Sequence, residues 1–237
     1  MCTVTFLPLG DNDFILTSNR DEMPARKTLE PRTYRENGVK LVYPKDQVAG
    51  GTWLGVSEKH RLVCLLNGGF KNHQRTSFYK ISRGVIVKHL LASNDVIGEI
   101  KRISFEEVEP FTIVLLEWSK VLKIYELVWD GEKKYFKRVD NKPHIWSSSS
   151  LYDKGVKQER KKWFSEWLEG NNRFDKNSII EFHQNDSKGT PETAIKMKRK
   201  SVETVSITCI SKKESNISFE YRSIINSQLF ELALKSF

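Results

Sequence analysis

The sequence predicts an α+β fold in which helices pack on sheets made mainly of antiparallel hairpins. Three observations predict this class. Short stretches of alternating apolar residues are separated by turn residues, a long helical pattern begins after Asp153, and strand patterns return near the C-terminus. No repeat, linker or low-complexity stretch interrupts the 237 residues. We therefore expect a single domain over residues 1–237.

The first predicted element is a hairpin, in which a turn at residues 10–13 joins strands at 1–7 and 14–18. Alternation gives one face of the first strand Cys2, Val4 and Phe6, and the other face Thr3, Thr5 and Leu7. A turn centred near residues 11 and 12 places Cys2 opposite Asp21, within a couple of residues. The motif SNRDE, which begins at the end of the second strand, is therefore expected beside Cys2.

A second hairpin is predicted from strands at 53–56 and 62–66, joined by a turn at 57–60. Its register brings Asn67 close to Gly50-Gly51. Glycines at this point let backbone amides approach another group closely. Either a binding site or a tight strand crossing would use that freedom.

The remaining elements follow from the same two periodicities. Helices are expected at 82–92, 94–102, 153–170 and around 179–183, and strands at 111–116, 121–128, 134–139, 144–149, 202–209 and 217–221. The long helix is the clearest of them, because Val156, Trp163, Phe164, Trp167 and Leu168 share one face.

Composition excludes several classes of protein. With 38% hydrophobic residues the chain is globular, yet it has no apolar run of about 18 residues that could span a membrane. Its first residues lack the layout of a secretory signal, so we expect a cytoplasmic protein. The three cysteines form no CxxC pair, and the five histidines show no metal-ligand spacing. Neither a disulfide framework, a metal site nor a cofactor is indicated.

The net charge of +9 raises the possibility of a nucleic-acid partner. The basic residues are dispersed, however, with short clusters only near 159–162 and 196–200. Such clusters are usually solvated surfaces, so nucleic acid is the least favoured partner. Oligomeric state does not follow from the sequence.

Cys2 is the main candidate for chemistry. Cysteine at the second position is small enough for methionine aminopeptidase to remove Met1, which leaves a residue with both a thiol and a free α-amine. The amine titrates near 7.7–8.0 and the thiol near 8.5, so the neutral amine can take the thiol proton without a histidine. If Met1 is retained, the thiol is present but the base is absent.

The expected neighbours of Cys2 suit acyl transfer. Arg20 would favour the thiolate, and Asp21 could accept hydrogen bonds from the α-ammonium. Asn67, with the Gly68 amide beside it, could donate to a developing oxyanion. Taken singly, these signals have plainer explanations, because Cys2 could pack in the core and the other motifs could be a solvated strand end and a turn.

At these residues the sequence resembles the NRDE family, also called the transport-and-Golgi-organization protein 2 family. The resemblance rests on Met1-Cys2, on the SNRDE motif at 18–22, on GGTWLGV at 50–56 and on the strand that ends in Asn67. That family is similar to cysteine N-terminal nucleophile (Ntn) hydrolases, such as choloylglycine hydrolases and penicillin V acylases. The resemblance implies a four-layer αββα sandwich of two mainly antiparallel sheets.

The resemblance also implies roles for particular residues. Cys2 would be the nucleophile, Arg20 and Asp21 its partners, and Asn67 part of the oxyanion hole. The relatives use a second asparagine after a later strand, where this chain has Ser148. The further substrate-contacting candidates are Asn19, Gly51, Trp53, Gly68 and Trp146.

The sequence and the resemblance lead to three hypotheses about function. The first is a cytoplasmic hydrolase or acyltransferase that acts on an amide or related acyl bond of a small molecule. The second is a non-catalytic carrier of haem or a lipid-like hydrophobic ligand, since the resemblance links eukaryotic members to haem and lipid handling. The third, least favoured, is a nucleic-acid-binding module.

Overall fold

The computed structural model describes residues 3–74, 76, 78–171 and 173–235. The chain divides into two units, each with its own antiparallel sheet. Unit 1 contains the chain up to Ala25 together with Lys142–Lys235, and unit 2 contains Arg26–Asn141. Whether they act as one domain, as the sequence predicts, stays a prediction.

The sheet of unit 1 has the strand order β10-β1-β2-β11-β12-β13, with every neighbouring pair antiparallel. Its strands are β1 (Thr3–Pro8), β2 (Phe14–Glu22), β10 (His144–Ser147), β11 (Glu203–Lys213), β12 (Asn216–Ser223) and β13 (Leu229–Lys235). The chain thus returns after β10 and two helices to complete the sheet that its first residues begin. This return brings residues from both ends of the sequence beside β2.

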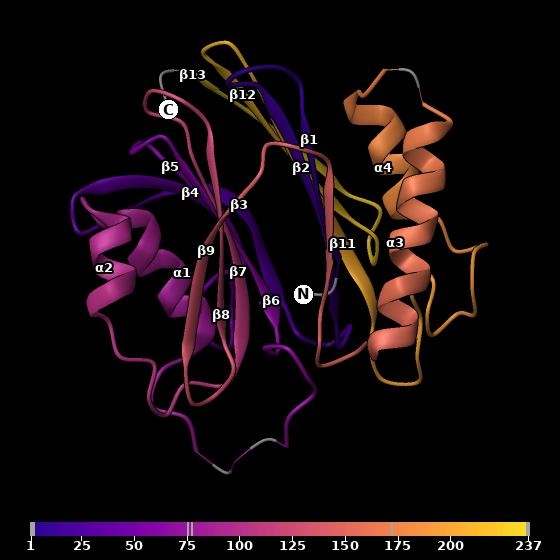
Figure 1. The fold of residues 1–237 in the computed structure, drawn as a ribbon, viewed down its shortest axis with the longest axis horizontal. Helices are drawn as coiled ribbons and strands as arrows, with labels where there is room; N and C mark the ends of the chain where they lie inside the picture. The colour runs from indigo at the N-terminus through magenta and orange to yellow at the C-terminus, as the bar shows by residue number, and fades with distance from the viewer. Residues whose placement is uncertain (1–2, 75, 77, 172, 236–237) are drawn as a thin grey trace. The chain divides into compact units, whose positions relative to one another are not determined.

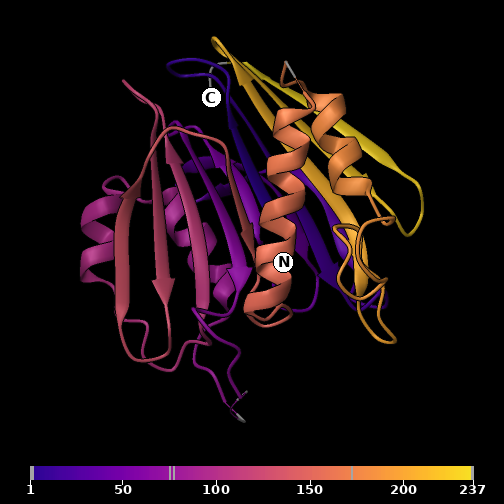
Figure 2. The same ribbon diagram turned by 45° about the vertical axis from the view of Figure 1, so that its right-hand side comes forward.

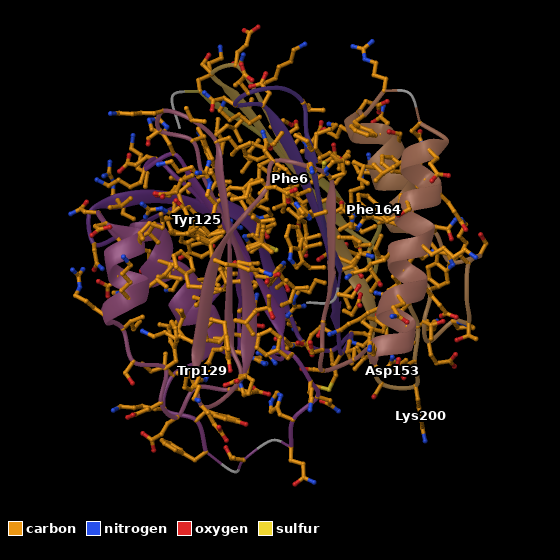
Figure 3. The ribbon with its side chains drawn as sticks, in the orientation of Figure 1. Phe6, Tyr125, Trp129, Asp153, Phe164 and Lys200 are labelled. Atoms are coloured by element: carbon orange, nitrogen blue, oxygen red, sulfur yellow. The ribbon has the colours of Figure 1, made fainter. Side chains whose placement is uncertain are left out.

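Two helices, α3 (Lys154–Glu169) and α4 (Lys176–Gln184), lie side by side on one face of this sheet (Figures 1 and 2). Each begins with an aspartate whose side chain accepts backbone N–H groups of the first turn. The core between helices and sheet consists of Leu7, Ile15, Phe164, Ile179, Ile180, Phe182, Ile195 and Cys209. Figure 3 shows Phe164 on the side of α3 that faces the sheet.

Unit 2 is a seven-stranded meander in which each strand pairs with the next along the chain. Its strands are β3 (Thr28–Glu36), β4 (Val39–Asp46), β5 (Leu54–Ser57), β6 (Arg61–Asn67), β7 (Phe111–Glu117), β8 (Lys123–Trp129) and β9 (Lys134–Val139). Helices α1 (Arg83–Ala92) and α2 (Val96–Arg102) come between β6 and β7, and α1 packs against β4, β5 and β6. Gly55 permits this packing, because a Cβ there would lie 2.8 Å from a Leu91 methyl carbon.

The expected α+β class with mainly antiparallel sheets is confirmed. The structure adds three strands that the patterns did not predict, namely β3, β4 and β13. Charged residues and a proline dilute the apolar alternation of β3, and β13 is largely exposed. One local signal was available: Asn37 and Gly38 have φ of 51° and 81°, a two-residue turn of the kind that joins hairpin strands.

Candidate functional site

The register of the first hairpin fixes which residues are neighbours of the chain's start. Thr3 on β1 lies opposite Asn19 on β2, one residue away from the expected register, which would have put Thr3 opposite Arg20. On its other side Thr3 pairs with Ser147 of β10. Cys2 lies outside the described residues, but it is bonded directly to Thr3.

Alternation along β2 sends neighbouring members of the motif to opposite faces of the sheet. Ile15, Asn19 and Asp21 face the helices of unit 1, as their contacts below show. Arg20 therefore lies on the other face, where it is 3% exposed. Opposite Arg20 and Asp21, strand β11 has a bulge between Thr204 and Ser206. Bulges often re-aim side chains next to active sites.

Asp21 is 4% exposed and accepts two hydroxyl hydrogen bonds. The Thr204 hydroxyl donates to Oδ1 at 2.7 Å, and the Tyr152 hydroxyl donates to Oδ2 at 3.1 Å. Two donors on a buried carboxylate fix its orientation. No sequence pattern indicated Tyr152, because the contact joins residues 131 positions apart.

Asn19 is fully buried, and its amide is engaged on both sides. The NH₂ group donates to the carbonyl oxygens of His183, at 3.1 Å, and Ile195, at 2.8 Å. The amide oxygen therefore accepts from Nδ1 of His183 at 2.6 Å, which leaves Nε2 to accept from the Thr5 hydroxyl at 2.7 Å. This placement favours a structural role for Asn19 over the substrate contact predicted for it.

His183 itself is a buried, neutral side chain. Burial is the main cause that lowers its pKa to about 3, and the nearby charge of Arg160 lowers it further. A neutral imidazole suits its position, because it donates at one nitrogen and accepts at the other.

Arg160 on α3 was also missed by the sequence analysis. It is fully buried, and its guanidinium donates to the Thr3 hydroxyl at 2.6 Å, to the carbonyl of Thr193 at 3.0 Å and to that of Ala194. It also stacks on the ring of Tyr152 at 3.6 Å. A charged residue within the apolar stripe of a helix was the available sequence signal.

The segment after β10 lies at the same end of the sheet. Trp146 pairs with Val4, and Ser148 is 1% exposed with its carbonyl accepting from the Tyr152 amide at 3.1 Å. Next to it, Lys157 donates to the Ser149 hydroxyl at 2.5 Å. Burial, and then the charge of Lys161, lower the pKa of Lys157.

Unit 2 holds the remaining predicted residues. Asn67 is the last residue of β6, is half-buried and pairs with Phe111. Gly68 follows with φ of 86°, and its N–H donates to the Pro110 carbonyl at 2.9 Å. The Gly68 amide predicted as an oxyanion donor is thus already used inside unit 2.

Gly51 makes a close backbone crossing. A Cβ at Gly51 would lie 2.5 Å from the carbonyl carbon of Gly84 at the start of α1, and the next amide, of Thr52, donates to the Gly84 carbonyl at 3.2 Å. Trp53 is 5% exposed, and its carbonyl accepts from the Leu65 amide. The neighbour of Gly51 is thus the start of helix α1 and not another strand, so the freedom of this glycine serves loop–helix packing and not the strand crossing that was predicted as one of its two uses.

Over the described ranges, no group of three or more His, Cys, Asp or Glu side chains gathers where it could hold a metal ion. In the same ranges, no helix is both long and apolar enough to cross a membrane.

A comparison of the sequence with models of known protein families found a match to one family. The family model described as "Transport and Golgi organisation 2" matches residues 1–225. No curated protein matches the sequence.

Solved structures share the fold at low sequence identity. A single-residue variant of the conjugated bile acid hydrolase from Clostridium perfringens is 12% identical with a TM-score of 0.58, over 98% of this chain and 92% of that one. The Caenorhabditis elegans ortholog of N-acylethanolamine-hydrolyzing acid amidase is 14% identical with a TM-score of 0.59, over 88% and 92%. Penicillin V acylase from Agrobacterium tumefaciens is 10% identical with a TM-score of 0.52, over 99% and 86%. The expected likeness to Ntn hydrolases is therefore confirmed at the level of the fold.

Proposed function

The chain belongs to the Transport and Golgi organisation 2 family, and on this premise we propose that it is a cytoplasmic N-terminal-cysteine hydrolase or acyltransferase. Its substrate would be a small molecule with a linear amide or related acyl bond. Removal of Met1 would expose Cys2 as the nucleophile and its own α-amine as the base.

One observation carries the proposal. Arg20 and Asp21 stand at the end of β2, next to the point where β1 begins with Thr3 opposite Asn19. Cys2 is the residue bonded to Thr3, so in the chain it directly precedes this pairing. This pairing supports the proposal, because a cation that would favour a thiolate and a carboxylate oriented by two hydroxyls follow on the strand that pairs with the residue next to Cys2.

The proposed reaction has two stages. The neutral α-amine takes the thiol proton, and the thiolate attacks the acyl carbon to give a tetrahedral oxyanion. Collapse breaks the C–N bond, the ammonium returns its proton to the leaving amine, and a thioester remains on Cys2. Water, or another acceptor in a transferase, then attacks the thioester with the same amine as base. The C–S bond breaks, the free acid or the acylated acceptor leaves, and the ammonium returns the proton to the sulfur of Cys2.

The supporting groups divide these tasks. Arg20 favours the thiolate by its charge, and Asp21 accepts from the α-ammonium, which belongs to the backbone and is not confined to one face of the sheet. Asn67 is the proposed oxyanion donor. The Gly68 N–H is left out of this role because it donates to Pro110. Trp53, Trp146 and Ser148 remain proposed substrate contacts.

The substrate class is supported by the structural relatives. Their names describe a conjugated bile acid hydrolase, an N-acylethanolamine-hydrolyzing acid amidase and a penicillin V acylase, and the last two refer to an acyl or amide group. One bile acid hydrolase structure is a C2A mutant, so that protein also has a cysteine at its position 2. Since the identities are low, these likenesses support a class of bond and not a particular substrate.

The test compares three proteins: the chain with Met1 removed, verified by intact mass; the same chain with Met1 retained; and Cys2→Ala. Each is offered p-nitrophenyl acetate and a series of acyl-p-nitroanilides of increasing chain length. We expect acylation of Cys2 and anilide hydrolysis only by the first protein, because only it has both thiol and base. Equal turnover by Cys2→Ala, with its fold unchanged by circular dichroism, would contradict the proposal.

The same variants test the carrier alternative. A haem carrier would bind haemin stoichiometrically, seen by absorbance, and would show no burst of acyl-enzyme.

A further inference from the structure

Arg160 is a buried cation, and the groups it contacts among the described residues are neutral. In the part of the chain that the structure describes, no Asp or Glu lies within ion-pair distance of its guanidinium, which is fully buried. A charge in the interior costs several kcal/mol unless its surroundings compensate it. Three hydrogen-bond acceptors and the face of the Tyr152 ring provide that compensation.

Through these contacts Arg160 is connected to two parts of the proposed site, namely the residue next to Cys2 and the carboxylate of Asp21. On one side Arg160 donates to the hydroxyl of Thr3, the residue bonded to Cys2. On the other it stacks on Tyr152, whose hydroxyl donates to the Asp21 carboxylate. The carbonyls of Thr193 and Ala194 hold the guanidinium in place.

We propose that Arg160 is a positioning residue for the N-terminal nucleophile: it fixes Thr3 directly and Asp21 through Tyr152, and so holds Cys2 in reach of its partners. This inference rests on the proposed function.

The physical reason is that the first residues of a chain are poorly ordered unless they are tied down. The backbone pairing of Thr3 with Asn19 and Ser147 supplies part of the restraint. A charge-assisted hydrogen bond to the Thr3 side chain adds a fixed point on the residue next to the nucleophile. A misplacement of about 1 Å at a reacting group can cost about a hundredfold in rate.

A plainer role is also open to Arg160, since a buried arginine can simply stabilise the packing of α3. Substitutions of Thr3 distinguish the two roles. Thr3→Val removes the hydroxyl but keeps a β-branched residue suited to a strand, whereas Thr3→Ser keeps the hydroxyl. A positioning role predicts that reactivity at Cys2 follows the hydroxyl and not the global stability.

The experiment measures alkylation of Cys2 by iodoacetamide at neutral pH in protein freed of Met1, followed by peptide mass spectrometry. Cys64 and Cys209 are buried and serve as internal controls, because they react only if the chain unfolds. The variants are Thr3→Val, Thr3→Ser and Arg160→Met. Lys161→Met is the matched control, since it removes one positive charge from an exposed neighbour on α3.

We expect Thr3→Val and Arg160→Met to slow the alkylation of Cys2 by about tenfold, with Cys64 and Cys209 still unreacted. Thr3→Ser should recover the rate that Thr3→Val loses, and Lys161→Met should react like the wild type. If Arg160→Met unfolds, as labelling of Cys64 would reveal, the comparison of Thr3→Val with Thr3→Ser tests the positioning role. Equal rates for Thr3→Val, Thr3→Ser and wild type would overturn the inference.

This result is separate from the test of the proposed function. If Cys2 alkylation follows the Thr3 hydroxyl while no anilide is hydrolysed, positioning stands and the hydrolase proposal falls. If anilides are hydrolysed while the Thr3 variants all react alike, the hydrolase proposal stands and the positioning inference falls.

Discussion

Asn19 and His183 are joined by two hydrogen bonds between residues 164 positions apart in the sequence. The imidazole Nδ1 donates to the amide oxygen of Asn19 at 2.6 Å, and the amide NH₂ donates to the backbone carbonyl of His183 at 3.1 Å. The pair fastens α4 to β2 at the strand that also carries Arg20 and Asp21.

The first prediction concerns pH and stability. His183 has a folded-state pKa lowered to about 3 by burial, against an ordinary value of 6.5, so below pH 6.5 the unfolded chain binds the extra proton first. The stabilisation is thus complete above pH 6.5 and is lost as the pH falls toward 3, by up to about 1.4 kcal/mol per pH unit. Urea unfolding at about pH 5 and about pH 7 should show the loss. His183→Gln should flatten this dependence, and an unchanged slope in that variant would argue against a neutral buried imidazole.

The second prediction concerns Asn19. Asn19→Ala should lower the free energy of unfolding by about 3 kcal/mol, because it leaves two carbonyls and the His183 Nδ1–H without a partner in the interior. The matched control is Asn216→Ala at an exposed position, where we expect a change within about 0.5 kcal/mol. Denaturant unfolding of both variants decides the matter, and equal small effects would contradict the structural role of Asn19.

The third prediction concerns the glycine crossing in unit 2. Gly51→Ala should destabilise the protein by about 2 kcal/mol or more, since the added Cβ would meet the backbone of Gly84 at 2.5 Å. Gly155→Ala is the control, because its nearest neighbour would be at 3.4 Å and alanine is the better helix former. In thermal unfolding, the melting temperature of Gly51→Ala should lie well below that of the wild type, and that of Gly155→Ala should equal or exceed it.

The fourth prediction concerns Arg20 and rests on the proposed function. A nearby cation favours the thiolate, so Arg20→Met should raise the pKa of the Cys2 thiol and slow its alkylation at neutral pH by about tenfold for each pKa unit. Arg20→Lys keeps the charge and should preserve most of the reactivity. The rate of iodoacetamide alkylation against pH provides the measurement. An unchanged profile in Arg20→Met would remove Arg20 from the proposed role.

Local patterns predicted most of the fold. Alternation and turn residues predicted the β1–β2 hairpin to within one residue of its register, and the apolar stripe of α3 predicted that helix closely. Strand β3 was missed because charged residues and a proline interrupt its apolar alternation, whereas β13 is an edge strand whose side chains are largely exposed.

The candidate site, like the fold, was predictable from the sequence only in part. The sequence by itself predicted Cys2 as the nucleophile and predicted that the SNRDE motif follows the strand that pairs with β1, since a hairpin register depends on residues close together in the chain. Only the tertiary structure brought Tyr152, Arg160 and His183 to that hairpin, across 131 to 164 residues, and turned Asn19 inward. Local periodicity decides which face a residue takes, but which distant side chain meets it depends on how helices pack on the completed sheet.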